Sequence, residues 1–347
     1  MRIDRYHRQT LLPQIGPEGQ KRLAAARVLL VGCGAIGSVV ADQLVRGGVG
    51  TLVIADRDVV ELTNLQRQVL FDEEDAQEEA PKAVAAARRL SRVNSGVVVE
   101  PVVSDVHAGN VEQIAGLEPR DRPVDLIVDG SDNAETRYVL NDVSVKHGVP
   151  WVYGACVGEE GRVMAVQPPR TPCLRCVFPE APTPGELPTC DTSGVLGPVA
   201  AVVGAMQAAA AIKLLVGAHV KPSLLTIDGW GGRFHLIDLS KGKRADCVTC
   251  GRQKFEWLTT TGGGSTSLCG RNAVQVWPQT SGQVDLAALA QKLSAAGTVE
   301  RTPHLLRCNF PDQRQLRLTV FPDGRAIVHG TDDLNRARSV YARYVGT

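Results

Sequence analysis

The chain has 347 residues and almost balanced charge, with 38 Lys and Arg against 37 Asp and Glu and a formal net charge of +1. This balance gives no electrostatic reason to expect nucleic acid or an acidic membrane surface as a partner. Hydrophobic residues make up 44% and charged residues 22%, which is typical of a globular protein. The length favours a main domain with a smaller appended one.

The N-terminal residues Met-Arg-Ile-Asp-Arg-Tyr-His-Arg-Gln contain no apolar segment, so we expect no secretory signal. The nine cysteines are better explained as metal ligands and free thiols than as a disulfide framework. We therefore expect the protein in a reducing cytoplasm.

A glycine-rich loop near the N-terminus indicates a nucleotide site. Residues 26–31 are short, β-branched and apolar on both faces, which predicts a buried parallel strand. The loop Gly32-Cys-Gly-Ala-Ile-Gly37 follows, and a helix is expected over 38–46. Gly32, Gly34 and Gly37 match the G-x-G-x-x-G pattern, in which the glycines allow a tight turn, close approach to phosphates and close helix packing. By itself, this glycine pattern also fits an NAD-dependent oxidoreductase.

Polar residues after the second predicted strand, 51–55, point towards a triphosphate. Asp56 ends that strand and suits the hydroxyls of a ribose. Asn64 and Arg67 follow in a polar loop, and Lys82 comes after Pro81 at the start of a helix predicted over 83–90. Arg and Lys beside a nucleotide neutralise charge that builds up during phosphoryl transfer. The alternative is that both are solvated surface residues.

A further strand, 124–128, is predicted as the third of the sheet, and Asp132 and Asn133 follow it before a helix over 134–146. Ligands of open α/β sheets lie beyond the carboxyl ends of the strands, so these side chains should face the same nucleotide. Asp132 can cap the helix, or it can help to hold Mg²⁺ and the phosphates.

Two cysteine pairs predict a zinc site. A two-residue gap within each pair lets both thiolates point at one ion, and two pairs complete a tetrahedral set with no open position, so the site would be structural. The alternative is two unrelated pairs or a redox-active disulfide. The four cysteines are Cys173, Cys176, Cys247 and Cys250.

The uncharged stretch 194–212 is rich in Ala and Gly, contains Pro198 and Gln207, and is followed at once by Lys213. This composition favours a closely packed core helix over a membrane span, which needs about 20 strongly apolar residues.

The predicted domains are a main unit over 1–251, a connector over 252–268 and a small α+β domain of unknown role over 269–347. Within the last we expect strands at 273–277 and 304–310, a helix from Asp285 to about Gly297, a hairpin (316–321 and 325–329) and a final helix over 332–344. Cys308 lies in a predicted strand and should be buried rather than reactive.

Together these motifs resemble the ThiF/MoeB/HesA family, bacterial relatives of ubiquitin-activating enzymes. The resemblance covers residues 5–251. It is carried by Arg5-Tyr-His-Arg8-Gln9, the glycine loop, Asp56, Asn64-Leu-Gln-Arg67-Gln68, Pro81-Lys82, Asp132-Asn133, Thr189-Cys190 and the four paired cysteines. One departure is local: the family usually has a glycine one residue before the Pro-Lys pair, and here Glu79-Ala80 precedes Pro81.

The resemblance implies a Rossmann-like, doubly wound, mainly parallel α/β sheet and an adenylation reaction. ATP·Mg²⁺ would activate the Gly-Gly tail of a ubiquitin-like sulfur carrier protein, and a cysteine desulfurase or sulfurtransferase would then supply sulfur. The glycine loop and Asp56 would hold the nucleotide, Asn64, Arg67 and Lys82 would contact ribose and phosphates, and Asp132 and Asn133 would serve the phosphates and Mg²⁺.

Two further residues owe their expected roles to the resemblance. Arg8 would reach into the site of a partner subunit as an arginine finger, which makes a homodimer the expected active unit. Cys190 would either take part in sulfur transfer or be merely an accessible thiol. The carrier serving thiamine thiazole synthesis is the first choice, with the molybdopterin-synthase carrier or a cysteine-synthesis carrier as alternatives. An NAD-dependent oxidoreductase with structural zinc is the alternative from another class.

Overall fold

The computed structural model describes residues 5–182, 193–259, 265–268, 272–277, 284–311 and 316–346. It divides into two compact units, Met1–Thr261 and Gly262–Thr347, and each is described by itself.

The first unit is built on an eight-stranded sheet in the order β3-β2-β1-β4-β5-β6-β7-β8. The neighbours from β3 to β5 pair in parallel, whereas the pairs from β5 to β8 are antiparallel. The mainly parallel α/β sheet expected from the sequence is therefore confirmed. The strands are β1 (Arg27–Val31), β2 (Thr51–Ala55), β3 (Val98–Val102), β4 (Leu126–Asp129), β5 (Trp151–Val157), β6 (Glu160–Val166), β7 (Ser223–Asp228) and β8 (Arg233–Asp238).

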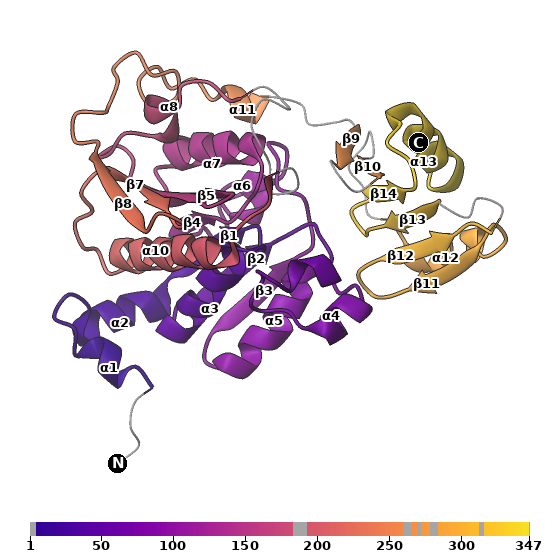
Figure 1. The fold of residues 1–347 in the computed structure, drawn as a ribbon, viewed down its shortest axis with the longest axis horizontal. Helices are drawn as coiled ribbons and strands as arrows, with labels where there is room; N and C mark the ends of the chain where they lie inside the picture. Colours follow the sequence, from indigo (N-terminus) through magenta and orange to yellow (C-terminus); the bar gives the residue numbers. More distant parts are fainter. Residues whose placement is uncertain are drawn as a thin grey trace. The chain divides into compact units, whose positions relative to one another are not determined.

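Helices cover both faces of this sheet (Figure 1). Helices α3 (Gly37–Gly47), α5 (Lys82–Val93) and α10 (Gly197–Leu215) pack into one core cluster, and α6 (Val111–Ile114) and α7 (Ala134–His147) pack into the other. Because helices cover both faces of the sheet, the side chains on both sides of β1 and β2 are buried, and the two strands are continuous apolar runs. The other helices among the described residues of this unit are α1 (His7–Thr10), α2 (Gly16–Ala25), the 3₁₀ turn η1 (Leu62–Asn64), α4 (Glu73–Gln77), α8 (Leu174–Val177) and α11 (Glu256–Thr259).

The prediction of the strand order was wrong at one place. The strand predicted as third is β4, and an earlier strand, β3, had been missed. Pro101 lies inside β3, and the residues of this strand are exposed or half-buried because it forms an edge of the sheet. Proline is tolerated on edge strands, but it weakens any sequence-based prediction of a strand.

Helix α10 contains most of the uncharged stretch 194–212 predicted as a core helix, and it extends past Lys213 to Leu215. Among the described residues it is the one helix long and apolar enough to cross a membrane, a test that core helices also pass, and 44% of the tested window is buried. Its inner side packs on β5, β6 and α3. A Cβ on Gly204 would lie 2.7 Å from the Ile36 carbonyl oxygen, so the close crossing of α10 over α3 requires a glycine here.

The second unit contains a six-stranded antiparallel sheet in the order β11-β12-β13-β14-β10-β9. One of its faces packs on two helices around a core that includes Leu306, Cys308 and Leu318. Cys308 is fully buried, as expected. The elements are β9 (Ser265–Leu268), β10 (Ala273–Val276), α12 (Leu286–Leu293), β11 (Thr298–Arg301), β12 (Leu306–Asn309), β13 (Arg317–Val320), β14 (Ala326–His329) and α13 (Leu334–Tyr344).

Some boundaries in this region differ from the prediction. The connector expected over 252–268 contains α11, which packs on α7, and β9, which pairs with β10. Strand β11 had also been missed. The predicted hairpin is present as β13 and β14, whose turn places Gly324 at a φ of 82°. Short strands such as β9 carry too few residues for their alternation to stand out.

Candidate functional site

The carboxyl ends of four parallel strands meet at one edge of the first sheet. The register pairs Val31 of β1 with Ala55 of β2 and with Asp129 of β4, and it pairs Ala55 with Val102 of β3. The loops after these strands therefore start side by side. We call the residues gathered there the strand-end site: the glycine loop 32–37, Asp56–Asp58, Asn64, Arg67, Gln68, Lys82, Asp105 and 129–133.

The three glycines of the loop have different surroundings. Gly32 has a φ of 84°, and a Cβ there would lie 2.7 Å from the Gly130 carbonyl oxygen. A Cβ on Gly37 would lie 2.9 Å from the Gly32 carbonyl carbon, so both positions are closed by backbone. At Gly34 the nearest atom would be Nε2 of Gln68, at 3.7 Å. Gly34 is half-buried just before α3, and its uncrowded backbone suits the close approach of a phosphate to a helix N-terminus.

Asp56 is held by the backbone of two neighbouring segments. Its Oδ2 accepts from the Cys33 N–H at 2.6 Å and its Oδ1 accepts from the Asp58 N–H at 2.7 Å. Burial raises the pKa of Asp56, and the Lys82 ammonium opposes that rise. The carboxylate is thus fixed beside the glycine loop, where its remaining lone pairs can accept from ribose hydroxyls.

Lys82 begins α5 and is buried, with a side chain that is only 5% exposed. Its Nζ lies 3.1 Å from Asp58 Oδ2, and its backbone N–H donates to the Asp58 carbonyl. The prediction that Lys82 is one of the site's residues fits this position better than the alternative of a solvated surface lysine.

The polar loop after β2 also reaches this region. Asn64 is buried, and its Oδ1 accepts from the Glu61 N–H at 3.0 Å, so part of its role is to shape the loop. Arg67 is half-buried, and its Nη1 donates to the Thr63 carbonyl at 2.9 Å. Gln68 is 4% exposed, and its Oε1 has no hydrogen-bond partner among the described residues. A buried amide beside Gly34 is a candidate ligand contact that had not been singled out.

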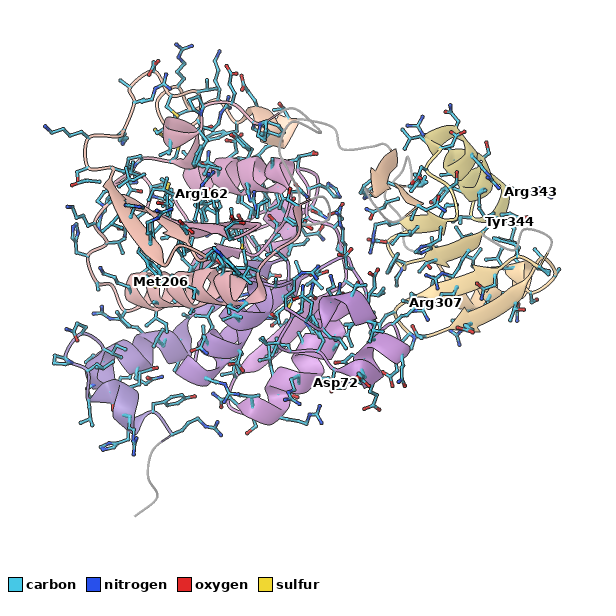
Figure 2. All side chains as sticks on the ribbon, viewed as in Figure 1. Asp72, Arg162, Met206, Arg307, Arg343 and Tyr344 are labelled. Carbon is cyan, nitrogen blue, oxygen red and sulfur yellow. The ribbon has the colours of Figure 1, made fainter. Side chains whose placement is uncertain are left out.

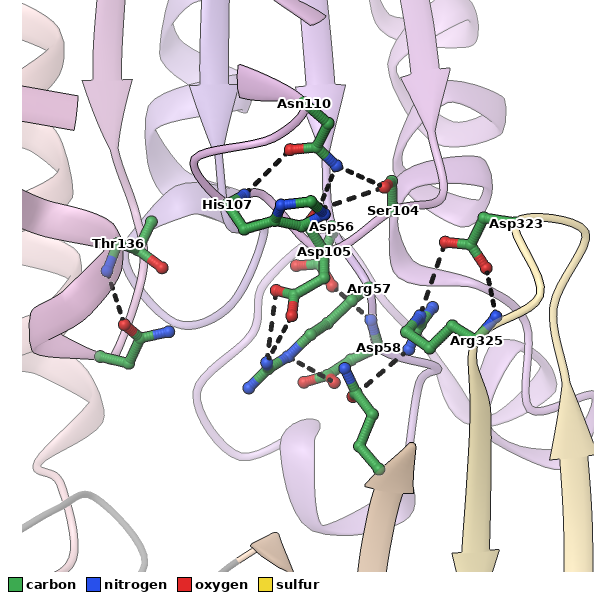
Figure 3. A network of polar contacts seen from close by, with 12 residues as sticks. Asp56, Arg57, Asp58, Ser104, Asp105, His107, Asn110, Thr136, Asp323 and Arg325 are labelled. Atoms are coloured by element: carbon green, nitrogen blue, oxygen red, sulfur yellow. Dashed lines mark hydrogen bonds and ion pairs between the residues drawn. The ribbon is translucent and has the colours of Figure 1, made fainter. Parts of the chain in front are cut away.

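Arg57 and Asp105 had not been predicted as site residues. The Nη1 atom of Arg57 lies 3.2 Å from Oδ2 of Asp105, and its Nε lies 3.8 Å from Oδ1 of Asp58 (Figure 3). Burial acts to lower the pKa of Arg57, but Asp105, Asp58 and Asp132 outweigh it and raise that pKa. No local pattern links these residues, because Asp105 follows β3 and Arg57 follows β2.

The loop after β4 departs from one expectation. The cap of α7 is Asn133, whose Oδ1 accepts from the Thr136 N–H at 2.8 Å. The alternative role of Asp132 as the helix cap is therefore wrong, and Asn133 has a structural task. Asp132 is exposed just before α7 and close enough to Arg57 to affect its pKa. An exposed carboxylate there remains able to serve a metal ion.

Arg8 does not lie at the strand-end site of its own chain. Arg8 is exposed on the short helix α1. The next residue of this helix, Gln9, donates to the Gly47 carbonyl at 2.9 Å. Gly47 is the last residue of α3, whereas the glycine loop is at the first. An 11-residue helix is about 16 Å long, so Arg8 lies far from the glycine loop of its own chain.

The four paired cysteines come together as expected. Their sulfur atoms all lie within 4.8 Å of one another, with 3.6 Å between Cys173 and Cys247 and 3.4 Å between Cys176 and Cys250. Tetrahedral zinc with Zn–S bonds of about 2.3 Å requires sulfur atoms about 3.8 Å apart. Burial and the neighbouring Cys176 raise the pKa of the Cys250 thiol, and a bound cation would favour its thiolate form. The cluster can hold a zinc ion that joins the loops after β6 and β8.

Cys190 lies outside the described residues, and so does Thr189.

Comparisons with known proteins agree with this architecture. The sequence profile of the ThiF family matches residues 6–249. The chain is 42% identical to the "Sulfur carrier protein ThiS adenylyltransferase" of Bacillus subtilis over 99% of both chains. It is 42% identical to the "Sulfur carrier protein adenylyltransferase" of Thermus thermophilus over 72% of this chain and 91% of that one. The crystal structure of MccB from E. coli has the same fold, with a TM-score of 0.62 at 23% identity over 72% of this chain and 75% of that one.

Proposed function

The chain belongs to the ThiF family, and from that membership we propose that it is an ATP-dependent adenylyltransferase for a ubiquitin-like sulfur carrier protein. The observation that carries the proposal is the meeting of Gly34, Asp56 and Lys82 at the ends of parallel strands. The 42% identity to a ThiS adenylyltransferase, over 99% of both chains, supports the substrate class. It also favours adenylation over NAD-dependent redox chemistry.

In the proposed reaction an oxygen of the carrier's C-terminal Gly-Gly carboxylate attacks the α-phosphorus of ATP. The bond from that phosphorus to the bridging oxygen breaks, pyrophosphate leaves, and a carrier acyl-adenylate remains. The chain's own residues would act mainly by positioning and by offsetting charge. The backbone at Gly34 would receive phosphate, and Asp56 would accept from the ribose. Arg67 and Lys82 would offset charge on phosphoryl oxygens, with Asn64 shaping the loop that carries Arg67.

Magnesium fits the carboxylate at the start of α7. Asp132 is exposed beside the other charged groups and offers the hard oxygen ligand that Mg²⁺ prefers, with phosphates and water completing the set. When bound, Mg²⁺ would offset phosphate charge. Asn133 would hold Asp132 in place through its cap of α7.

In a homodimer, Arg8 of a second copy would complete the strand-end site. An exposed apolar surface supports this arrangement. Phe234 and Leu236 of β8 are 59% and 66% exposed, and they pair with Ile227 and Leu225, which pack into the core cluster beneath α10. They therefore lie on the sheet face that carries α10, where Met206 is 41% exposed (Figure 2). Apolar groups gathered in this way are typical of protein interfaces.

In the later step, the persulfide of a cysteine desulfurase or sulfurtransferase would attack the acyl carbon, and AMP would leave. A second thiol would then reduce the resulting acyl disulfide, which releases the thiocarboxylate and a disulfide. We place this reaction in the cytoplasm, where the buried zinc-site thiols would stay reduced. The relative from Bacillus subtilis favours the carrier of thiamine thiazole synthesis, with Cys190 as a candidate for sulfur transfer.

ATP–pyrophosphate exchange tests the proposal. The full-length protein should catalyse exchange with an intact carrier and not with one that lacks the last glycine. Lys82→Ala and Asp132→Ala should nearly abolish exchange. Exchange without any carrier, or exchange that Asp132→Ala leaves unchanged, would contradict the mechanism. Comparing thiazole, molybdopterin-synthase and cysteine-synthesis carriers would identify the preferred pathway.

A further inference from the structure

Arg57 is a charged residue of the strand-end site for which the proposed chemistry has no role. It follows Asp56 directly and lies between two carboxylates from different loops (Figure 3). Its Nη1 is 3.3 Å from Oδ1 and 3.2 Å from Oδ2 of Asp105, and its Nε is 3.8 Å from Oδ1 of Asp58. The side chain is 25% exposed, so these contacts are only partly screened by solvent.

Asp105 is a fixed anchor and not a free surface acid. The side-chain amide of Asn110 donates to the Asp105 carbonyl at 2.7 Å, and Asn110 Oδ1 accepts from the His107 N–H at 2.9 Å. The Ser104 hydroxyl also donates to the Asp105 carbonyl, at 3.2 Å. These bonds hold the loop after β3 in one shape, so Arg57 is held in place from outside its own loop.

Asp58 contacts two cations, one at each oxygen. Its Oδ2 is 3.1 Å from Lys82 Nζ, and its Oδ1 faces Arg57. Under the proposed function the phosphates of ATP also need Lys82, so a carboxylate and a phosphate compete for the same ammonium. A second cation beside Asp58 lowers its negative potential and weakens its hold on Lys82.

We propose that Arg57, anchored by Asp105, is a positioning residue that partly neutralises Asp58 and so leaves Lys82 available to the phosphates of ATP. The inference deepens the proposed function and rests on it for the role of Lys82. Without Arg57, Asp58 would hold Lys82 more tightly and ATP would bind less well. Removing the charge of Asp58 as well should then release Lys82.

The test is a cycle of variants in the full-length protein, read as the dissociation constant for ATP·Mg²⁺ by isothermal titration calorimetry without any carrier. Arg57→Gln should raise that constant about tenfold, the size expected for one charge-assisted contact. Arg57→Lys, which keeps the charge, should raise it less. The double variant Arg57→Gln/Asp58→Asn should return to within about threefold of the wild type.

A matched control lies in the same sheet, between the first residue of β1 and the central residue of β3. Arg27 and Glu100 form a bidentate ion pair, at 2.9 and 2.7 Å, that joins β1 to β3. Arg27→Gln should lower the free energy of unfolding without changing the ATP constant. If Arg57→Gln proves unstable, Asp105→Asn tests the same anchor and should weaken ATP binding in the same direction.

Two results would overturn the inference: wild-type affinity in Arg57→Gln, or a double variant as weak as Arg57→Gln or weaker. The readout also separates the two proposals. A wild-type protein that binds ATP but exchanges pyrophosphate with no carrier would refute the proposed adenylation, while the cycle would still decide the role of Arg57. A wild-type protein that does not bind ATP would refute both.

Discussion

Alanine substitutions in the glycine loop should separate stability from nucleotide binding. At Gly37 a Cβ would lie 2.9 Å from the Gly32 carbonyl carbon and closer still to its oxygen. At Gly34 the nearest atom, Nε2 of Gln68, would be 3.7 Å away, which is an ordinary van der Waals contact. The alanine methyl group at position 37 therefore meets backbone of the same chain, whereas the one at position 34 meets no backbone and lies where we propose that a phosphate binds.

The expected magnitudes follow from these distances. Backbone cannot move aside as a flexible side chain can, so Gly37→Ala should lower the free energy of unfolding by about 3 kcal/mol or more. Gly34→Ala should change it by no more than about 1 kcal/mol, because no contact is broken. The new methyl group would push a phosphate off the loop backbone, and the loss of one charge-assisted hydrogen bond of about 2 kcal/mol weakens ATP binding about 30-fold.

Urea unfolding and isothermal titration with ATP·Mg²⁺ measure the two effects independently. Gly130→Ala provides a second clash, because its Cβ would lie 2.9 Å from Gly37 Cα. It should behave like Gly37→Ala. The reasoning fails if Gly34→Ala binds ATP as tightly as the wild type, or if Gly34→Ala is destabilised as strongly as Gly37→Ala.

Three further predictions concern other parts of the first unit. Cys247→Ser should reduce the zinc content, measured by metal analysis, below one equivalent. It should also lower the midpoint of thermal unfolding, measured by calorimetry. Full zinc retention would contradict a four-cysteine site. Leu236→Glu on β8 should shift the protein from dimer to monomer in light scattering and should reduce ATP–pyrophosphate exchange. The control Val98→Glu, at an exposed position of β3, should change neither result. A dimer that survives Leu236→Glu would place the interface elsewhere. Glu79 has a φ of 45°, so Glu79→Gly should raise the free energy of unfolding by up to about 1 kcal/mol in urea titrations, and a loss of stability would contradict strain at this residue.

Much of the first unit could be predicted because its signals are local. The strand Thr51–Ala55 was predicted to the residue, and α3 and α5 differ from the prediction by a few residues at their ends. The absent family glycine before Pro81 also has a structural counterpart, since Glu79 adopts the left-handed φ that glycine favours. Such signals depend on the conformational limits of single residues and on short-range periodicity.

Other features escaped prediction because they depend on contacts between distant segments. The edge strand β3 contains a proline, and its residues are exposed or half-buried, so its apolar pattern is weak. It is defined by its pairing with β2. Asn133 and not Asp132 caps α7, and this depends on a difference of one residue in where the loop after β4 ends and the helix begins.

Backbone preferences and residue spacing act over a few positions, and they were enough to identify the glycine loop, the paired cysteines and the acid after β2 from the chain alone. The partners of a charged side chain are set by packing, which brings segments from several strands to one edge of a sheet. Arg57 meets Asp105 and Asp58 meets Lys82 for that reason, across 48 and 24 positions of the chain. The spacing of these residues along the chain does not predict the pairs, because the pairs form only when β2, β3 and α5 pack together.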